Sequence, residues 1–340
     1  MTSPAFNTDF AARYGVVERV APGIRRVLAH NPSKYSAWGT GTYLVGGDAA
    51  HGGPGGPVAV IDPGPDLDEH HEALDRALDG EEVAAILITH THADHSPASR
   101  LLAERTGAPR YGFGPHPPDA DELAEHEHRP ETNEAVPDGD HGAGEAHGDL
   151  EFTPDVVLAH GDVVGPRQHR GAAWRFESLH TPGHLSNHLC FAELDRGVLF
   201  SGDHVMGWST TVVSPPAGDM AAYFSSLELL LDRAEHTYYP THGPAIIDPV
   251  PFVRSLIEHR RERDRQLLSL LAERGEQSVA ELVEVIYASV RAELHAPARR
   301  SALAHLLRLS DLGRVVSVGD RGGGGGRVFR VASTSGHMSS

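Results

Sequence analysis

The chain has 340 residues, of which 39% are hydrophobic, and its formal net charge at pH 7 is −18. This length predicts two domains, and the apolar fraction is large enough to build a packed core. No run approaches the roughly 18 apolar residues that cross a bilayer, which excludes a membrane-spanning protein. Cys190 is the only cysteine, so an intrachain disulfide is excluded as well. The first twenty residues lack an apolar core, and we therefore expect no export signal and a cytoplasmic location.

The N-terminal third alternates short apolar runs with helical segments. Strands are predicted over residues 16–20, 24–29, 42–45, 58–61 and 83–88. A helix is predicted over 66–78, because Leu67, Leu74 and Leu78 recur at helical spacing. A second helix is predicted over 97–105 and begins with a proline, which the first turn tolerates. The pattern indicates an α/β protein.

A dense group of candidate metal ligands follows the predicted strand over 83–88. The sequence there reads Thr-His-Thr-His-Ala-Asp-His-Ser, so that His90, His92, Asp94 and His95 fall within six residues. Imidazole and carboxylate are the ligands that Zn²⁺, Fe²⁺ and Mn²⁺ prefer. Irregular chain of this length can direct His90 and His92 at one ion and Asp94 and His95 at a second. A solvated histidine-rich loop is the alternative, but the position directly after a hydrophobic strand favours a metal site.

Residues 114–155 form an acidic segment. They contain thirteen acidic residues and one base, Arg129, and so account for −12 of the net charge. The segment is rich in Pro, Gly and His and has little apolar periodicity, which predicts a flexible surface insertion. Its histidines could bind metal, but we expect a solvated loop and assign no catalytic residue to it.

Three further candidate ligands stand in glycine-bearing turns in the second half of the chain. Strands are predicted over 156–159, 174–179, 189–193 and 198–200, and a helix over 220–233. His184 lies in the turn Thr-Pro-Gly-His, Asp203 in Ser-Gly-Asp-His and His242 in Thr-His-Gly-Pro. Each turn follows an apolar run, and its glycine allows the sharp bend that directs a ligand inward. Together with the first group, these turns predict one metal site built from four loops.

The ordered set HxHxDH, TPGH, SGDH and THGP resembles the metallo-β-lactamase-fold hydrolase superfamily. The resemblance implies an αββα sandwich over residues 1–250, with metals at one sheet edge. Matched position by position, it assigns one metal to His90, His92 and His184, the other to Asp94, His95 and His242, and the bridge to Asp203. It also implies that Asp62 supports the ligand loop by hydrogen bonding. His204 would support the site or serve the fold.

The C-terminal segment differs from the rest in charge and pattern. Helices are predicted over 252–274, from Ser278 to residue 290 and over 299–312, with capping-box spacing at Ser278 and Glu281. Strands over 315–318 and 328–331 flank a glycine run. Three helices and a hairpin resemble a winged helix over 251–335. Fourteen arginines against ten acids give residues 251–340 a net charge of +4.

Several segments resemble one branch of the superfamily, the β-lactamase-like protein 2 group, which carries such a C-terminal domain. They are Asn31-Pro32-Ser33, residues 39–46, residues 202–209 and His259-Arg260-Arg261-Glu262. Two positions depart from the branch. Ala93 replaces a larger, charged residue, which bears on substrate contacts. Thr241 replaces a glycine, and we expect it to require a backbone conformation that threonine tolerates poorly.

The ligand set predicts the chemistry. Two divalent ions, Zn²⁺ or alternatively Fe²⁺ or Mn²⁺, would share a bridging hydroxide that attacks a carbonyl carbon or a phosphorus atom. Asp94 would hold or relay the proton. Asp203, where antibiotic-hydrolysing members have cysteine, argues against a β-lactamase. We favour a small carbonyl substrate, namely a thioester, ester or lactone.

Two alternatives remain from the sequence. The branch's endoribonuclease activity would use the basic tail to bind the RNA backbone. A nucleic-acid-binding protein without hydrolase activity belongs to another class, against which the seven retained ligands argue. The tail could instead pack over the active-site edge or form a homodimer contact.

Overall fold

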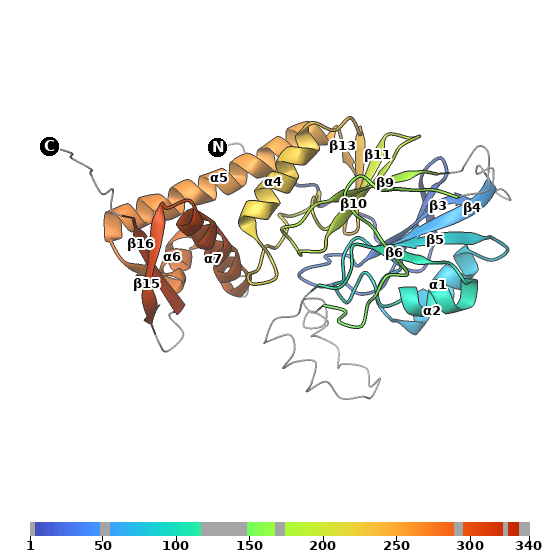
Figure 1. Ribbon diagram of the computed structural model, residues 1–340, viewed down its shortest axis with the longest axis horizontal. Coiled ribbons are helices and arrows are strands. Elements are labelled where there is room, and N and C mark those ends of the chain that lie inside the picture. The colour runs from blue at the N-terminus through green and yellow to red at the C-terminus, as the bar shows by residue number, and fades with distance from the viewer. Residues whose placement is uncertain are drawn as a thin grey trace.

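The computed structural model describes residues 4–47, 55–116, 148–166, 174–288, 295–321 and 326–332 (Figure 1). Most of the acidic segment expected over 114–155 lies outside the described residues, so its flexibility stays a prediction. Within the described parts of the chain, no helix is long and apolar enough to cross a membrane.

The first sheet has seven strands in sequence order. They are β1 (Val17–Ala21), β2 (Ile24–Leu28), β3 (Gly41–Gly47), β4 (Gly55–Ile61), β5 (Val83–Leu87), β6 (Arg110–Gly112) and β7 (Val156–Val157). Strands β1 to β4 pair antiparallel, whereas β4 to β7 pair parallel. The helices α1 (Asp68–Ala77) and α2 (Ser99–Thr106) connect the parallel strands, and they pack Leu74 and Leu102 against the sheet.

The second sheet has six strands in the order β13-β12-β11-β10-β9-β8. Their bounds are β8 (Val163–Val164), β9 (Phe176–His180), β10 (Leu189–Glu193), β11 (Val198–Gly202), β12 (Thr237–Pro240) and β13 (Ile246–Ile247). The helix α4 (Met220–Leu231) covers its outer face, where Cys190 packs beside Leu227 as a buried apolar residue.

The two sheets pack face to face around an aromatic core. Tyr43 and Ile61 of the first sheet share one buried cluster with Phe176, Phe191 and Phe200 of the second. With helices outside each sheet, the layers run helix, sheet, sheet, helix, so the expected αββα sandwich is confirmed (Figure 1). Burial of such large rings stabilises the fold by about 25 cal/mol per Å² of apolar area removed from water.

The C-terminal unit has its own core. Its elements are α5 (Pro249–Arg274), β14 (Gln277–Ser278), α6 (Val279–Ile286), α7 (His295–Asp311), β15 (Val315–Arg321) and β16 (Gly326–Val331). The capping box at Ser278 and Glu281 is present and starts α6. Leu271, Leu306 and Phe329 lie in one buried cluster. This arrangement is a winged helix, as expected from the sequence.

The helix α5 joins the two units. It runs from the edge of the second sheet to the three-stranded wing (Figure 1). Val253 and Leu256 near its start lie in the core cluster of α4, whereas Leu267 and Leu271 near its end lie in the winged-helix core. Ala304 of α7 also packs in the α4 cluster, so the winged helix contacts the αββα sandwich directly.

Candidate metal centre

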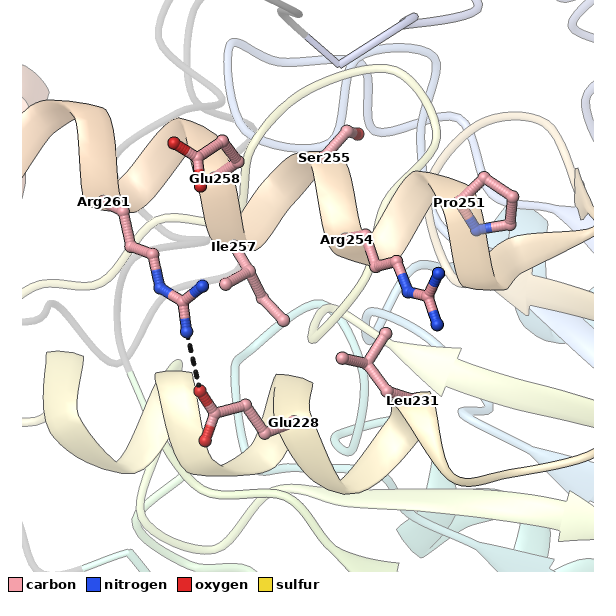
Figure 2. A pocket seen from close by; sticks show the side chains of 8 residues that line it. All are labelled: Glu228, Leu231, Pro251, Arg254, Ser255, Ile257, Glu258 and Arg261. Carbon is pink, nitrogen blue, oxygen red and sulfur yellow. Dashed lines mark hydrogen bonds and ion pairs between the residues drawn. The ribbon is translucent and has the colours of Figure 1, made fainter.

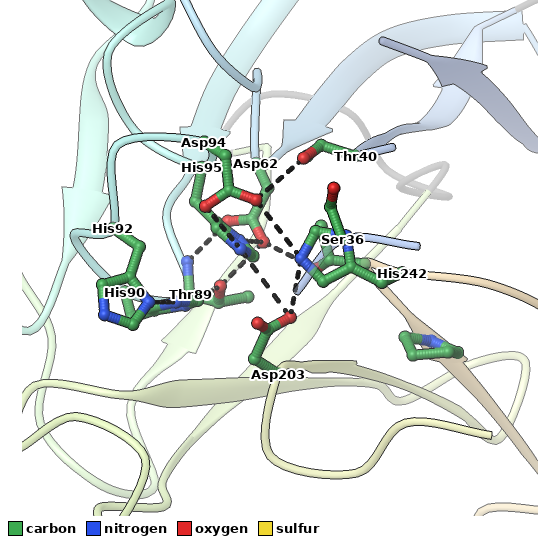
Figure 3. Close-up of polar contacts among 12 residues, drawn as sticks. Ser36, Thr40, Asp62, Thr89, His90, His92, Asp94, His95, Asp203 and His242 are labelled. Atoms are coloured by element: carbon green, nitrogen blue, oxygen red, sulfur yellow. Dashed lines mark hydrogen bonds and ion pairs between the residues drawn. The ribbon is translucent and has the colours of Figure 1, made fainter. Parts of the chain in front are cut away.

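The seven expected ligands come together where the strands of both sheets end. Figure 3 shows all of them except His184. Three groups of ligand atoms each lie within 4.8 Å of one another. They are His90 with His92 and His184, Asp94 with His95 and His242, and His90 with His95 and Asp203. The first two groups match the two ion sites implied by the sequence, and the third lies between them.

Asp203 faces both ion sites, one oxygen to each. Its Oδ1 lies 3.3 Å from Nε2 of His242 and 3.7 Å from Nε2 of His95. Its Oδ2 lies 3.8 Å from Nε2 of His184. A carboxylate that spans two groups of nitrogen ligands in this way suits a bridge between two cations.

Two buried polar atoms test whether divalent ions fit this site. Within the described chain, Nε2 of His95 and Oδ1 of Asp203 form no hydrogen bond. Orphaned polar atoms in a protein interior cost free energy unless another partner binds them. The atoms are an imidazole nitrogen and a carboxylate oxygen, which are the ligand types of Zn²⁺, Fe²⁺ and Mn²⁺. The residues therefore fit divalent ions.

The histidine rings are oriented by hydrogen bonds on their outer nitrogens. The Nδ1 atoms of His184 and His242 lie 2.7 Å and 3.1 Å from the carbonyl oxygens of Val212 and Gly39. Because a carbonyl only accepts, Nδ1 carries a hydrogen, and Nε2 is the nitrogen that faces the site. The Nδ1 of His95 lies 2.8 Å from Oδ2 of Asp62. Such outer contacts fix ring orientation in metal sites.

Asp62 ties several ligand loops together. It accepts hydrogen bonds from the backbone N–H of Thr89 at 2.8 Å, the Thr89 hydroxyl at 2.7 Å and the Thr241 hydroxyl at 3.0 Å. Asp62 itself has a left-handed φ of 47°. The expectation that Thr241 needs a strained backbone is wrong, because the φ of Thr241 is not positive.

Burial and neighbouring charges set the protonation of the site. Burial alone would raise the pKa of Asp94, but His95 and His242 outweigh it and lower that pKa to about 2. Burial also lowers the pKa of His90 and of His92 well below the usual value, with help from neighbouring imidazoles. At His95 and His242 burial is outweighed by Asp94 and Asp203, which raise the pKa of His95 to about 9 and that of His242 well above its usual value. Because neutral imidazoles and ionised carboxylates are the forms that bind metal, ions that bind here would displace the protons of these two rings.

His204 lies outside the three ligand groups. Its ring centroid lies 4.9 Å from that of Tyr223, and burial lowers its pKa to about 3. Its backbone oxygen accepts a hydrogen bond from the Tyr223 hydroxyl at 3.1 Å. These contacts favour a role in the fold over direct participation in the site.

Two polar residues at the site were not identified from the sequence. Thr40 donates a hydrogen bond from its hydroxyl to Oδ2 of Asp94 at 2.9 Å. His188 accepts one on Nε2 from the backbone N–H of Asp203 at 3.2 Å, and its ring stacks on His90. Thr40 lies in the segment 39–46 that resembles the branch, and this resemblance could have pointed to Thr40. His188 had none, because its spacing from His184 matches no ligand pattern considered.

A second recess is lined by residues other than the candidate metal ligands. A groove of about 630 Å³ lies between α4 and α5, and Figure 2 shows the side chains that line it. Leu231 and Ile257 lie beside charged residues that include Glu228 and Arg261, which pair at 3.2 Å. None of the metal-ligand groups lines it.

Comparison with known proteins agrees with this geometry. The profile of the Metallo-beta-lactamase superfamily matches residues 37–242, more than half of the chain. The chain belongs to this superfamily. The profile of the Beta-lactamase associated winged helix domain matches residues 278–325. As a metallo-beta-lactamase superfamily member with thioesterase-named relatives, the protein is a hydrolase.

Individual relatives cover most of the chain. It is 30% identical over 283 residues to an atrochrysone carboxyl ACP thioesterase of Aspergillus chevalieri, which covers 81% of this chain and 76% of that protein. It is 29% identical over 309 residues to a beta-lactamase-like protein 2 homolog of Drosophila melanogaster, with 88% and 91% covered. The expected resemblance to this branch is thereby confirmed.

A solved structure with the same overall fold comes from Burkholderia ambifaria and is described as a beta-lactamase domain protein. The two chains superpose with a TM-score of 0.71 at 23% identity, and 96% of each is covered. At this identity the likeness concerns the fold, including the C-terminal unit, and not the activity.

Proposed function

We propose that this metallo-beta-lactamase superfamily member is a binuclear metal-dependent hydrolase of small carbonyl substrates, foremost thioesters. The observation that carries the proposal is the position of Asp203, whose two oxygens face two separate groups of nitrogen ligands. A site for a single ion would not need a carboxylate whose two oxygens face different groups of ligands.

In this proposal each ion has its own set of residues. One ion would be held by His90, His92 and His184 and the other by Asp94, His95 and His242, and Asp203 would serve both. Zn²⁺ is the ion we favour, and Fe²⁺ and Mn²⁺ suit the same ligands. When bound, two such ions supply an activated water and polarise the carbonyl oxygen of the substrate.

Asp94 is the residue we assign to proton transfer. Thr40 fixes its Oδ2, which also lies 3.3 Å from Nε2 of His242, so the carboxylate has one defined orientation. With a pKa of about 2 the group is ionised at neutral pH and can accept a proton transiently. Asp62 holds the loops that carry Asp94 and His242, through Thr89, His95 and Thr241.

Carbonyl substrates are favoured over phosphodiesters by the relatives. One of them is named as a thioesterase and covers most of this chain. We propose that the winged helix forms a separate unit over 251–335. Residues 251–340 carry a net charge of only +4, which is a weak basis for binding a nucleic acid backbone. The cytoplasmic location stays a prediction.

A parallel turnover assay tests this function. Zinc-loaded protein is offered acyl thioesters, lactones and single-stranded RNA, together with the variants Asp203→Ala and, as a control, Asp195→Ala at an exposed carboxylate paired with Arg175. We expect thioester hydrolysis that Asp203→Ala lowers at least 100-fold and Asp195→Ala leaves unchanged, because only Asp203 lies in the site. RNA cleavage without thioester hydrolysis would contradict the proposed substrate class. Wild-type turnover by Asp203→Ala would contradict the site.

A further inference from the structure

Arg260 is a buried cation at the junction of the winged helix and the catalytic layers. It lies on α5 with only 4% of its surface exposed. Its Nη2 donates to the carbonyl oxygen of Thr211, and its Nη1 lies 3.2 Å from the hydroxyl of Ser301 on α7. The guanidinium carbon lies 5.4 Å from the ring centroid of Tyr223 on α4. Burying a charge costs several kcal/mol unless hydrogen bonds compensate, so this position calls for an explanation.

The segment that Arg260 holds carries contacts to two candidate metal ligands. The hydroxyl of Thr211 lies 2.7 Å from the carbonyl oxygen of Asp203 and 3.0 Å from that of His204. The next residue, Val212, accepts the hydrogen bond from Nδ1 of His184 at 2.7 Å. Thus one short segment secures the backbone of Asp203 and the ring orientation of His184.

We propose that Arg260 is a positioning residue of the metal centre, which fixes Asp203 and His184 through Thr211 and Val212. The C-terminal helices would then be part of the site's architecture rather than an appended unit, since Arg260 and Ser301 both come from them. This inference rests on the ligand set of the proposed function and adds a residue that touches neither ion nor substrate.

A role in the interface alone would predict something different. If Arg260 only joined the two units, its loss would lower stability and leave the metal site unchanged. If it positions Asp203 and His184, its loss must weaken metal binding, because supporting contacts of this kind are worth about 10–100-fold in metal affinity.

The neighbouring Arg261 provides a matched control. It lies on the same helix, is about half exposed and pairs with Glu228 in the open groove (Figure 2). Its substitution removes the same charge from the same helix without touching the Thr211 segment. Exposed pairs of this kind contribute little to stability.

The experiment uses the full chain with Co²⁺ in place of the native ion. Wild type, Arg260→Met, Arg260→Lys and Arg261→Met are compared by circular dichroism, by the visible absorption of bound Co²⁺ and by competition with a chelator. We expect Arg260→Met to bind Co²⁺ at least 10-fold more weakly with an altered spectrum, Arg260→Lys to lie between it and wild type, and Arg261→Met to match wild type.

Each outcome bears on a separate claim. A folded Arg260→Met with wild-type affinity and spectrum overturns the positioning role. If Arg260→Met does not fold, Arg260→Lys decides the matter, because it keeps the charge but cannot reach both oxygens, and wild-type binding by it overturns the role equally. Failure of the wild-type protein to bind Co²⁺ at all overturns the proposed function instead.

Discussion

At the scale of single residues, the site contains buried carboxylates, and each of them lies against histidine side chains. Asp62, Asp94 and Asp203 are all less than 10% exposed, and each faces histidine nitrogens. An unpaired charge in such a place would be strongly destabilising. The cluster is therefore stable only as a set, in which Asp62 joins the loop of Thr89 and His95 to the loop of Thr241.

His70 shows how the surroundings of the site respond to pH. Its Nε2 lies 2.9 Å from the carbonyl oxygen of Pro63, directly after Asp62, whereas its Nδ1 is buried without a hydrogen bond among the described residues. Burial lowers the pKa of His70 to about 4, below its ordinary value of 6.5. The unfolded chain therefore binds a proton more readily than the folded one between these values.

We expect the stabilising contribution of His70 to be lost as the pH falls from about 6.5 to about 4. Glutamine can keep the hydrogen bond to Pro63 without titrating, so the stability of wild type relative to His70→Gln should decline over this window by up to about 3 kcal/mol. Urea unfolding of both metal-free proteins at several pH values measures it. A difference that stays constant with pH would show that His70 is not held neutral.

The fold brings together the residues that the sequence predicts as ligands, and their role stays a prediction. Among the supporting residues, Asp62 was predicted, and Thr40 and His188 were not. His90, Asp203 and the others could be found because each follows an apolar run within a short pattern. Thr40 and His188 act through hydrogen bonds that only the fold creates. The strain expected at Thr241 is absent, because its φ is not positive.

At the scale of elements, the strand-end turns decide where the ligands point. Gly202 joins β11 to Asp203 with a φ of 51°, and a Cβ there would lie 2.6 Å from Nε2 of His188 and 2.9 Å from Cβ of Thr89. The turn therefore needs glycine for two reasons, conformation and close packing.

We expect Gly202→Ala to lower the free energy of unfolding by more than backbone strain alone would. Gly80→Ala is the control, because Gly80 has a φ of 72° and nothing within 4 Å of a new Cβ. Strain should cost each variant about 1–2 kcal/mol, and the contact with His188 should cost Gly202→Ala roughly 1–3 kcal/mol more. Urea unfolding measures the difference. Equal losses in the two variants would refute the packing argument.

Long or strongly patterned elements could be predicted from sequence, whereas most of the short ones could not; the exception is β7, which lies in the strand predicted over 156–159. The strand over 189–193 was located to the residue, and α5 was predicted over 252–274 against the observed Pro249–Arg274. The strands β6, β8, β13 and β14 have only two or three residues each, too few for a periodic pattern. They form because a neighbouring strand already presents hydrogen-bonding groups.

At the scale of the whole molecule, the sandwich and the winged helix pack against each other beside the site. The core cluster of α4 includes residues of α5 and Ala304 of α7, and Arg260 reaches the Thr211 segment. The sequence left open whether the tail guides a nucleic acid, forms a dimer or packs on the catalytic layers. The described contacts support the packing role, and they give the tail a function that needs no second ligand.

The central claim is that this chain holds two divalent ions, and elemental analysis tests it most directly. Protein purified under metal-replete conditions and freed of unbound ions is assayed for zinc, iron and manganese per chain, alongside Asp203→Ala. The account predicts about two ions in the wild type and fewer in the variant. A wild-type protein that retains no ion would contradict it.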